Sequence, residues 1–143
     1  MIGTTDPALA DRMVRVLEEN GSVRSWVVTG HGGLDEIATT GPTRILELED
    51  GHIDEWQLDP MDIGLRLAEP AELVGGSPEE NAAIARAIFC GEDRGPRRDI
   101  VALNAAAGLV VAGVVDGIVA GFEAAGAAID DGRVSEILDA ITD

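Results

Sequence analysis

The feature that most limits how this chain can fold is a short apolar run that ends in a glycine-rich loop. The run Val27-Val28-Thr29 is followed by Gly30, by Gly32-Gly33 and by two adjacent acids, Asp35 and Glu36. β-Branched residues favour a strand, and ligands of open α/β sheets bind beyond the carboxyl ends of the strands. The sequence therefore predicts an α/β fold with Asp35 and Glu36 at the ligand-binding edge of its sheet.

Asp35 and Glu36 are the candidate metal ligands. Paired carboxylates on a tight loop suit Mg²⁺, which takes hard oxygen ligands and shares its shell with water and substrate phosphate. The neighbouring glycines favour a backbone that lies close to a ligand. The simpler alternative is a pair of solvated acids, in a chain with 27 acidic residues. His31 could complete a transition-metal site or only help to form the loop.

The charge balance excludes some classes of partner. The 143 residues include 27 acids against 10 basic residues, all of them arginine, for a net charge of −17. Binding to a phosphate backbone needs clustered cations, so we expect no nucleic-acid partner. The single cysteine, Cys90, excludes an internal disulfide and fits a reducing cytoplasm. Its apolar neighbours predict a packing role for Cys90.

One long apolar stretch raises the possibility of a membrane span. From Ile100 to Phe122 the only charged residue is Asp116, and the length would suit a bilayer. Four glycines and Asn104 interrupt the stretch, which favours two core helices instead, with Asp116 capping the second. Asn104 is predicted to be a buried hydrogen-bonding anchor. Arg97-Arg98 precede the stretch at a helix start, where they could meet a phosphate, but they are interpreted as a solvated helix end.

Capping and turn signals divide the rest of the chain. Asp6-Pro7 predicts a helix start, Asp50-Gly51 a β-hairpin turn, and Ser77-Pro78-Glu79-Glu80 a capping box. His52, after the turn, is expected to be exposed. The predicted elements, in order, are a helix over 6–20, a strand over 25–29, a hairpin over 44–58, an irregular connection over 59–72, a helix over 77–90, two core helices between 96 and 131, and a last helix over 134–141.

Several segments together resemble one enzyme family. The segment from Val27 to Ala38 resembles the glycine loop and Asp-Glu motif of anthranilate phosphoribosyltransferases, and later segments match the same family in the same order. These are Thr40-Gly41-Pro42-Thr43, the run from Gly76 to Ala82, Gly95-Pro96-Arg97-Arg98-Asp99, and Leu103-Asn104-Ala105-Ala106-Ala107. Nucleoside phosphorylases of the related fold are the near alternative.

The resemblance implies a fold, a reaction and a cofactor. The fold would be the C-terminal part of the phosphoribosyltransferase α/β domain, a small sheet with a β-hairpin packed against several helices. The reaction would transfer the phosphoribosyl group of phosphoribosyl pyrophosphate to anthranilate, a step of tryptophan biosynthesis. Asp35 and Glu36 match the acidic pair that binds Mg²⁺ on the pyrophosphate, and no catalytic residue is assigned. The setting would be cytoplasmic, with no membrane partner.

The chain departs from the family pattern in two ways. The family's acid before Gly-Leu-Asp-Glu is a glycine here, in Gly32-Gly33-Leu34. The family's N-terminal helical region with its dimer contact, its Gly-Thr-Gly-Gly-Asp substrate loop and its Lys-His-Gly-Asn residues near anthranilate have no counterpart in these residues. We therefore expect a single partial domain over 1–143, inactive alone or active only with a complementary N-terminal half. The alternative is a non-catalytic binding module derived from the family.

Overall fold

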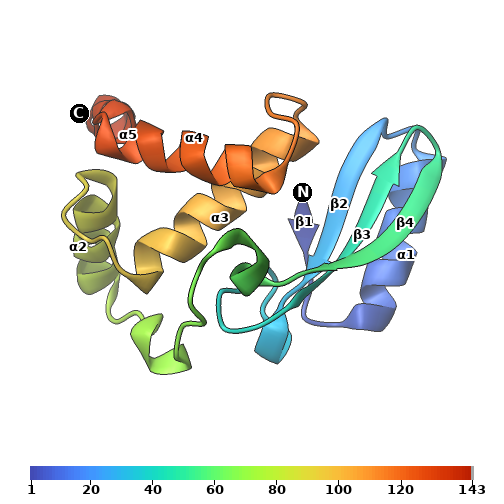
Figure 1. Cartoon of the computed structure of the whole chain (residues 1–143), viewed down its shortest axis with the longest axis horizontal. Coiled ribbons are helices and arrows are strands. Elements are labelled where there is room, and N and C mark those ends of the chain that lie inside the picture. Colours follow the sequence, from blue (N-terminus) through green and yellow to red (C-terminus); the bar gives the residue numbers. More distant parts are fainter. Residues whose placement is uncertain (143) are drawn as a thin grey trace.

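A mixed sheet and five α-helices make up the computed structural model, which describes residues 1–142 (Figure 1). The strands are β1 (Ile2–Gly3), β2 (Arg24–Thr29), β3 (Thr43–Glu49) and β4 (His52–Leu58). The helices are α1 (Pro7–Glu19), α2 (Pro78–Phe89), α3 (Pro96–Val111), α4 (Ile118–Asp130) and α5 (Arg133–Thr142), with short 3₁₀ turns η1 (His31–Gly33), η2 (Pro60–Ile63) and η3 (Pro70–Glu72). The predicted α/β class is confirmed.

The sheet has the strand order β1-β2-β3-β4. β1 runs parallel to β2, and the other neighbours are antiparallel. The predicted hairpin joins β3 to β4 through Asp50 (φ 48°) and Gly51 (φ 79°), the two positive φ values that a type I′ turn requires. β1 was not predicted, because two residues are too short to show a strand pattern. Its pairing places the carboxyl ends of β1 and β2 at one edge of the sheet.

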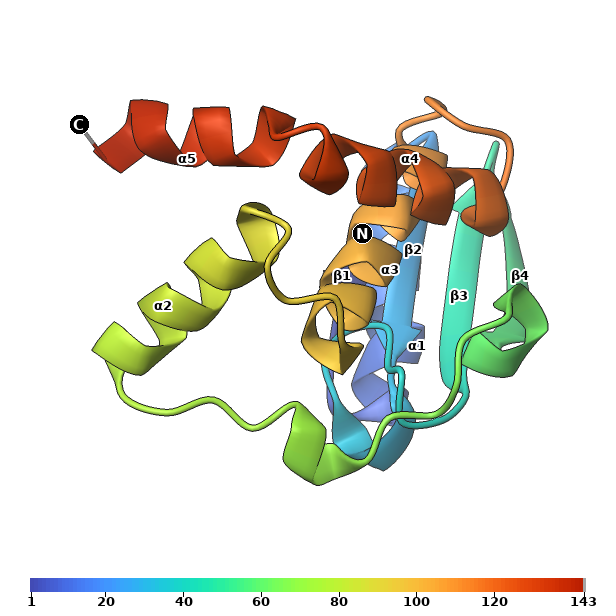
Figure 2. The same ribbon diagram turned by 60° about the vertical axis from the view of Figure 1, so that its left-hand side comes forward.

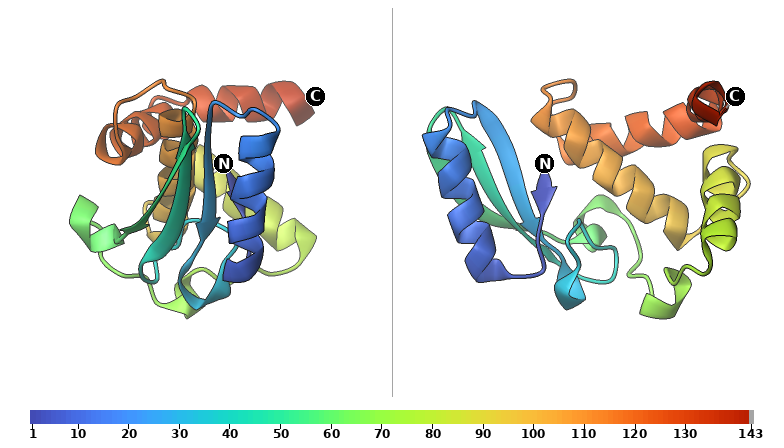
Figure 3. Two further views of the ribbon diagram at one scale, coloured as in Figure 1. Left: turned by 90° about the vertical axis from the view of Figure 1, so that its right-hand side faces the viewer. Right: turned by 180° about the vertical axis from the view of Figure 1, so that it is seen from behind.

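Each face of the sheet is covered by a helix (Figure 3). α1 packs on one face, over a cluster that includes Ala10, Val14, Val27, Leu46 and Leu48. α3 packs on the other face, over a cluster that includes Trp26, Val28, Ile45, Leu103 and Ala107. Ile53 and Trp56 of β4 join different clusters, as their predicted opposite orientations require. The sheet is therefore the middle layer of three.

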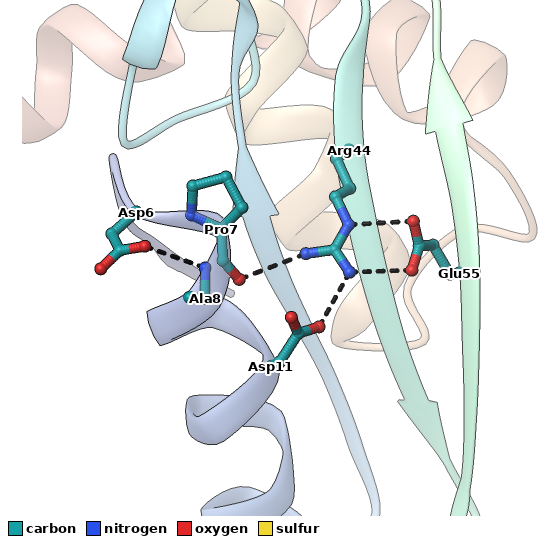
Figure 4. A network of polar contacts seen from close by, with 6 residues as sticks. All are labelled: Asp6, Pro7, Ala8, Asp11, Arg44 and Glu55. Atoms are coloured by element: carbon teal, nitrogen blue, oxygen red, sulfur yellow. Dashed lines mark hydrogen bonds and ion pairs between the residues drawn. The ribbon is translucent and has the colours of Figure 1, made fainter.

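Arg44 of β3 connects the sheet to the N-terminal part of α1 (Figure 4). Its guanidinium donates to both carboxylate oxygens of Glu55, at 2.9 and 2.8 Å. It also donates to Asp11 Oδ1 at 2.8 Å and to the carbonyl of Pro7 at 3.4 Å. A bidentate arginine–carboxylate pair has a fixed geometry that a single ion pair lacks. The network therefore sets the position of α1 against β3 and β4.

The later helices extend away from the sheet (Figure 2). α3 and α4 cross closely because Gly121 presents no side chain to Ala106. α2 and α5 lie farther out, beyond the end of α3. No helix among the described residues is long and apolar enough to cross a membrane.

The predicted helix starts are confirmed with one exception. Asp6 Oδ1 accepts from Ala8 N at 2.9 Å, and Ser77 and Glu80 form the reciprocal capping box. The prediction that Asp116 caps α4 is wrong. Gly117 occupies the cap position without a side-chain hydrogen bond, and Asp116, one residue before it, is exposed.

The packing role predicted for Cys90 is also wrong. Cys90 is exposed, because α2 ends at this residue and the chain reverses at Gly91 with a φ of 73°. The apolar run before it is only partly used for packing, since Ile88 is buried and Cys90 faces solvent. His52 is exposed, as predicted.

Candidate metal centre

The loop that carries the two acids begins where β2 ends. Gly30 N donates to the carbonyl of Leu34 at 2.8 Å, which closes the loop on itself. Gly32 and Gly33 inside it have φ values of 71° and 82°, a left-handed region that side chains disfavour. The two glycines therefore allow the turn. Asp35 and Glu36 follow it at the carboxyl edge of the sheet, as the sequence predicts.

Two further glycines bring the acid pair close to the strands. A methyl group on Gly3 of β1 would overlap the carbonyl oxygen of Asp35, and one on Gly30 would overlap the carbonyl oxygen of Glu36. The glycine content of this region predicted a backbone close to a ligand. The structure instead uses Gly3 and Gly30 to let one backbone segment lie against another.

The two carboxylates are adjacent and exposed. Partial burial, and after it the negative charge of Asp35, raises the pKa of the Glu36 carboxyl. A raised carboxyl pKa means that the negative form is disfavoured, and a bound divalent cation would reverse that preference. Two accessible carboxylates are also the hard oxygen donors that Mg²⁺ takes. The residues therefore fit a Mg²⁺ ion whose remaining ligands are water and substrate oxygens.

His31 does not complete a metal site with them. Its Nδ1 lies 3.3 Å from Thr40 Oγ1, and its ring packs against Gly41, where a methyl group would come within 2.6 Å of the ring. Within the part of the chain that the structure describes, no group of three histidine, cysteine or acidic residues is placed to hold a metal. The structure thus favours the loop-forming role of His31 over a transition-metal site.

Asn104 of α3 contacts the segment that follows the acid pair. Its side chain accepts from Ile37 N at 2.9 Å and donates to Ile37 O at 2.8 Å. A second donated bond reaches Ile100 O at 3.0 Å. The predicted hydrogen-bonding role is confirmed, although Asn104 is half-buried rather than buried, and its partner, 67 residues away in sequence, is the residue next to Glu36.

Arg97 and Arg98 make structural contacts rather than standing free in solvent. Arg97 donates to Val74 O at 2.9 Å. Arg98 is 13% exposed and lies 3.2 Å from Asp130 of α4. The interpretation of both residues as solvated is therefore wrong, because the start of α3 is packed against the 59–77 connection and against α4.

A cavity of about 340 Å³ opens beside Glu36. Its walls are mostly apolar and come from Leu34, Ile88, Phe89 and Ile100, while Glu36 and Arg97 are its charged members. The partial burial of Glu36 follows from this position. Sequence reasoning missed the cavity because its walls come from the acidic loop, the connection, α2 and α3, and no local pattern marks them as neighbours.

Comparison with known proteins assigns the chain to a family. Residues 1–135 match the sequence profile described as the glycosyl transferase family, a/b domain. The chain belongs to this glycosyl transferase family. The family resemblance inferred from the Asp-Glu loop is thereby confirmed.

Two curated relatives of this chain are anthranilate phosphoribosyltransferases. The enzyme of Methylobacterium nodulans is 48% identical over 139 residues, which are 97% of this chain and 41% of that protein. The enzyme of Desulfosudis oleivorans is 40% identical over 139 residues, again 97% of this chain and 41% of the relative. The chain thus spans about two fifths of the length of the curated relatives that it matches.

Solved structures of the same enzyme share the fold. The anthranilate phosphoribosyltransferase of Thermus thermophilus superposes with a TM-score of 0.86 at 36% identity, covering 96% of this chain and 40% of that one. A variant of the Saccharomyces cerevisiae enzyme with Mg bound superposes with a TM-score of 0.85 at 25% identity, covering 96% of this chain and 40% of that one.

Proposed function

We propose that this chain is the portion of an anthranilate phosphoribosyltransferase that supplies the Mg²⁺-binding element, and that Asp35 and Glu36 are its metal ligands. The observation that carries the proposal is the accessible acid pair at the carboxyl edge of the sheet, in a chain 48% identical to a curated enzyme of that name. The yeast structure with Mg bound supports the choice of metal. A single partial domain over 1–143 and a cytoplasmic setting belong to the same proposal.

The proposed reaction joins anthranilate nitrogen to the ribose carbon of phosphoribosyl pyrophosphate, with release of pyrophosphate. A bound Mg²⁺ would neutralise the charge that builds on the departing pyrophosphate. Asp35 and Glu36 would hold the ion through carboxylate oxygens, which leaves water and pyrophosphate oxygens to complete its shell. Their fixed backbone would orient the ion without a rearrangement during the reaction.

We further propose that turnover requires a complementary polypeptide. The chain spans 41% of the Methylobacterium nodulans enzyme. β1 is an edge strand, and next to it Ile2, Leu9, Met13 and Val16 line an open apolar groove of about 300 Å³. An exposed edge beside apolar surface is a typical site for pairing with another chain. The complementary segment of the family is the occupant that we propose for this surface.

The test follows anthranilate fluorescence in the presence of Mg²⁺ and phosphoribosyl pyrophosphate. We expect no turnover by the 143-residue chain alone, and turnover after addition of the part of the Methylobacterium nodulans enzyme that this chain does not match. Asp35→Asn with Glu36→Gln should remove the restored turnover. The matched control, Glu18→Gln with Glu19→Gln, neutralises another adjacent acid pair and should not.

Each contrary outcome has a definite meaning. Turnover by the chain alone would refute the need for a partner. A folded complex in which the Asp35 and Glu36 substitutions leave turnover unchanged would refute the assigned metal ligands. A complex that forms and never turns over would favour a non-catalytic binding module.

A further inference from the structure

Asn104 uses its whole amide group to connect α3 to the acidic loop. Its oxygen accepts from Ile37 N, and its two N–H groups donate to Ile37 O and to Ile100 O in its own helix. An asparagine side chain has two donors, and both are occupied here. The side chain therefore fixes Ile37 at both backbone polar groups and at the same time is itself fixed to α3.

The residues after Glu36 are anchored at two successive amides. Asn104 holds the amide of Ile37, and Thr43 Oγ1 of β3 accepts from the amide of Ala38 at 2.9 Å. The side chains of Ile37 and Ala38 are both 0% exposed. Rotation of the chain at this point would expose apolar surface and break these hydrogen bonds, so the path of the backbone beyond Glu36 is fixed by tertiary contacts.

The acid pair itself has no such anchor of its own. Asp35 and Glu36 are exposed, and the loop before them contains Gly32 and Gly33, the residues with the greatest backbone freedom. On the near side, Gly30 N donates to the carbonyl of Leu34, and Gly3 and Gly30 leave room for the backbone of the pair. The direction of the two carboxylates is therefore set from both sides, and Asn104 supplies the side-chain contact on the far side, through Ile37.

We propose that Asn104 is a positioning residue for the divalent cation: it does not touch the ion but holds Ile37 so that Asp35 and Glu36 present their carboxylates together. This inference rests on the proposed metal role of the pair and adds a residue to it. Groups that hold metal ligands in place commonly change metal affinity by about tenfold or more when they are removed.

The amide is the group that this position needs. An aspartate could accept from Ile37 N but could not donate to Ile37 O or Ile100 O. An apolar side chain would leave the polar groups of Ile37 without their side-chain partner. A purely structural role would also require the amide, since Asn104 connects two elements, so the test must separate cation affinity from stability.

The experiment measures Mn²⁺ affinity of the 143-residue chain by electron paramagnetic resonance, with Mg²⁺ competition, for wild type, Asn104→Ala and two controls. Asn81→Ala removes a second asparagine that bonds both polar groups of a loop residue, Gly76. Val110→Ala truncates a core residue of the same helix, 4% exposed, and should lower stability while leaving the Asn104–Ile37 hydrogen bonds in place. All samples are measured well below their unfolding temperature.

We expect about a tenfold loss of Mn²⁺ affinity in Asn104→Ala, and wild-type affinity in both controls. Hydrogen exchange provides a second readout on the wild type alone: the Ile37 amide should be protected far more than that of Gly32. This readout keeps the inference testable if Asn104→Ala does not fold.

Three outcomes would overturn the inference. One is a folded Asn104→Ala variant that binds Mn²⁺ as tightly as wild type, and another is an Ile37 amide that exchanges as fast as that of Gly32. In the third, Val110→Ala loses as much Mn²⁺ affinity as Asn104→Ala, which would mean that the loss of affinity comes from lower stability and not from the missing amide. Absence of Mn²⁺ binding by wild type is a different result, because it overturns the proposed metal role itself.

Discussion

The sheet region and the outer helices of this chain are packed very differently. In the sheet, Val28, Ile45 and Leu48 are 0% exposed. On the outer helices, by contrast, Ile137 and Ile141 of α5 are 64% and 75% exposed. The sheet core is filled on both faces, although Ile2, Leu9 and Val16 beside its β1 edge stay exposed, whereas α5 leaves two large apolar side chains mostly uncovered.

Apolar hollows lie beside both regions, and the groove next to β1 has a volume of about 300 Å³. A cavity of about 440 Å³ lies between α3, α4 and the start of α5, lined by residues such as Phe89, Leu109, Ile129 and Val134. Interiors of folded proteins have few voids larger than a water molecule. The outer helices therefore leave the larger of these two apolar hollows open, while the sheet region has a filled core and an open edge at β1, and this difference in packing is what the predictions below test.

The largest expected effect comes from truncating the sheet core. Leu48→Ala removes a fully buried side chain beneath α1 and should lower the free energy of unfolding by about 3 kcal/mol. The matched change on the outer helices, Ile137→Ala, should cost within about 0.5 kcal/mol, because that side chain already contacts solvent. Urea denaturation followed by circular dichroism measures both, and equal losses would contradict the contrast between the two regions.

The next effect tests a polar contact within the sheet. Glu47 accepts from Trp26 Nε1 at 2.7 Å and from Trp56 Nε1 at 3.0 Å, and its Oε1 lies 3.3 Å from Arg24. Glu47→Gln keeps the shape but turns one oxygen into a donor, so one indole loses its acceptor. We expect a loss of about 2 kcal/mol, with a shift of tryptophan emission.

The two indole rings make this prediction directly observable. They pack edge to face, with centroids 5.2 Å apart, and are the only tryptophans in the chain. An unchanged emission spectrum together with unchanged stability would show that Glu47 is not the acceptor that orders them.

A smaller effect tests the boundary between the two regions, where α3 crosses α4. A methyl group on Gly121 would lie 2.9 Å from Ala106 O and 3.0 Å from Ala106 Cα, so Gly121→Ala should separate the helices and cost about 1 kcal/mol. Gly108→Ala is the control, since nothing lies within 4 Å of its added methyl. Gly108→Ala should raise the free energy of unfolding by about 0.5 kcal/mol, because alanine has a higher helix propensity than glycine. Thermal unfolding of both variants measures the sign of each change.

The smallest effect is a pH dependence at the candidate metal centre. Burial, and then Asp35, raises the pKa of Glu36 in the folded state, so folding favours the protonated carboxyl. The contribution of Glu36 to the free energy of unfolding is therefore fully present at low pH and is lost as the pH rises through its raised pKa. Glu36→Gln should be more stable than wild type at pH 7, and the difference should disappear near pH 4. Urea midpoints at the two pH values test this, and a variant less stable than wild type at pH 7 would contradict it.

Local signals in the sequence predicted the elements well. Asp6-Pro7 fixes the start of α1 because its side chain caps the first turn, and Asp50-Gly51 fixes the hairpin because few residues accept positive φ at two consecutive positions. Ser77 fixes the start of α2 in the same local way. The Asp-Glu loop could also be placed at a strand end, since a strand, its turn and the acids are contiguous.

Tertiary structure alone decided what lies next to that loop. Gly3 touches Asp35 and Asn104 bonds Ile37 only because β1 and α3 meet at the same edge of the sheet, across sequence separations that no periodic pattern encodes. The exposure of Cys90 was likewise decided by where α2 ends and which way the chain then turns. The sequence by itself determined the elements and the acid pair, because caps and turns depend on neighbouring residues. Only the packed structure determined how the pair is held, because that depends on contacts between distant ones.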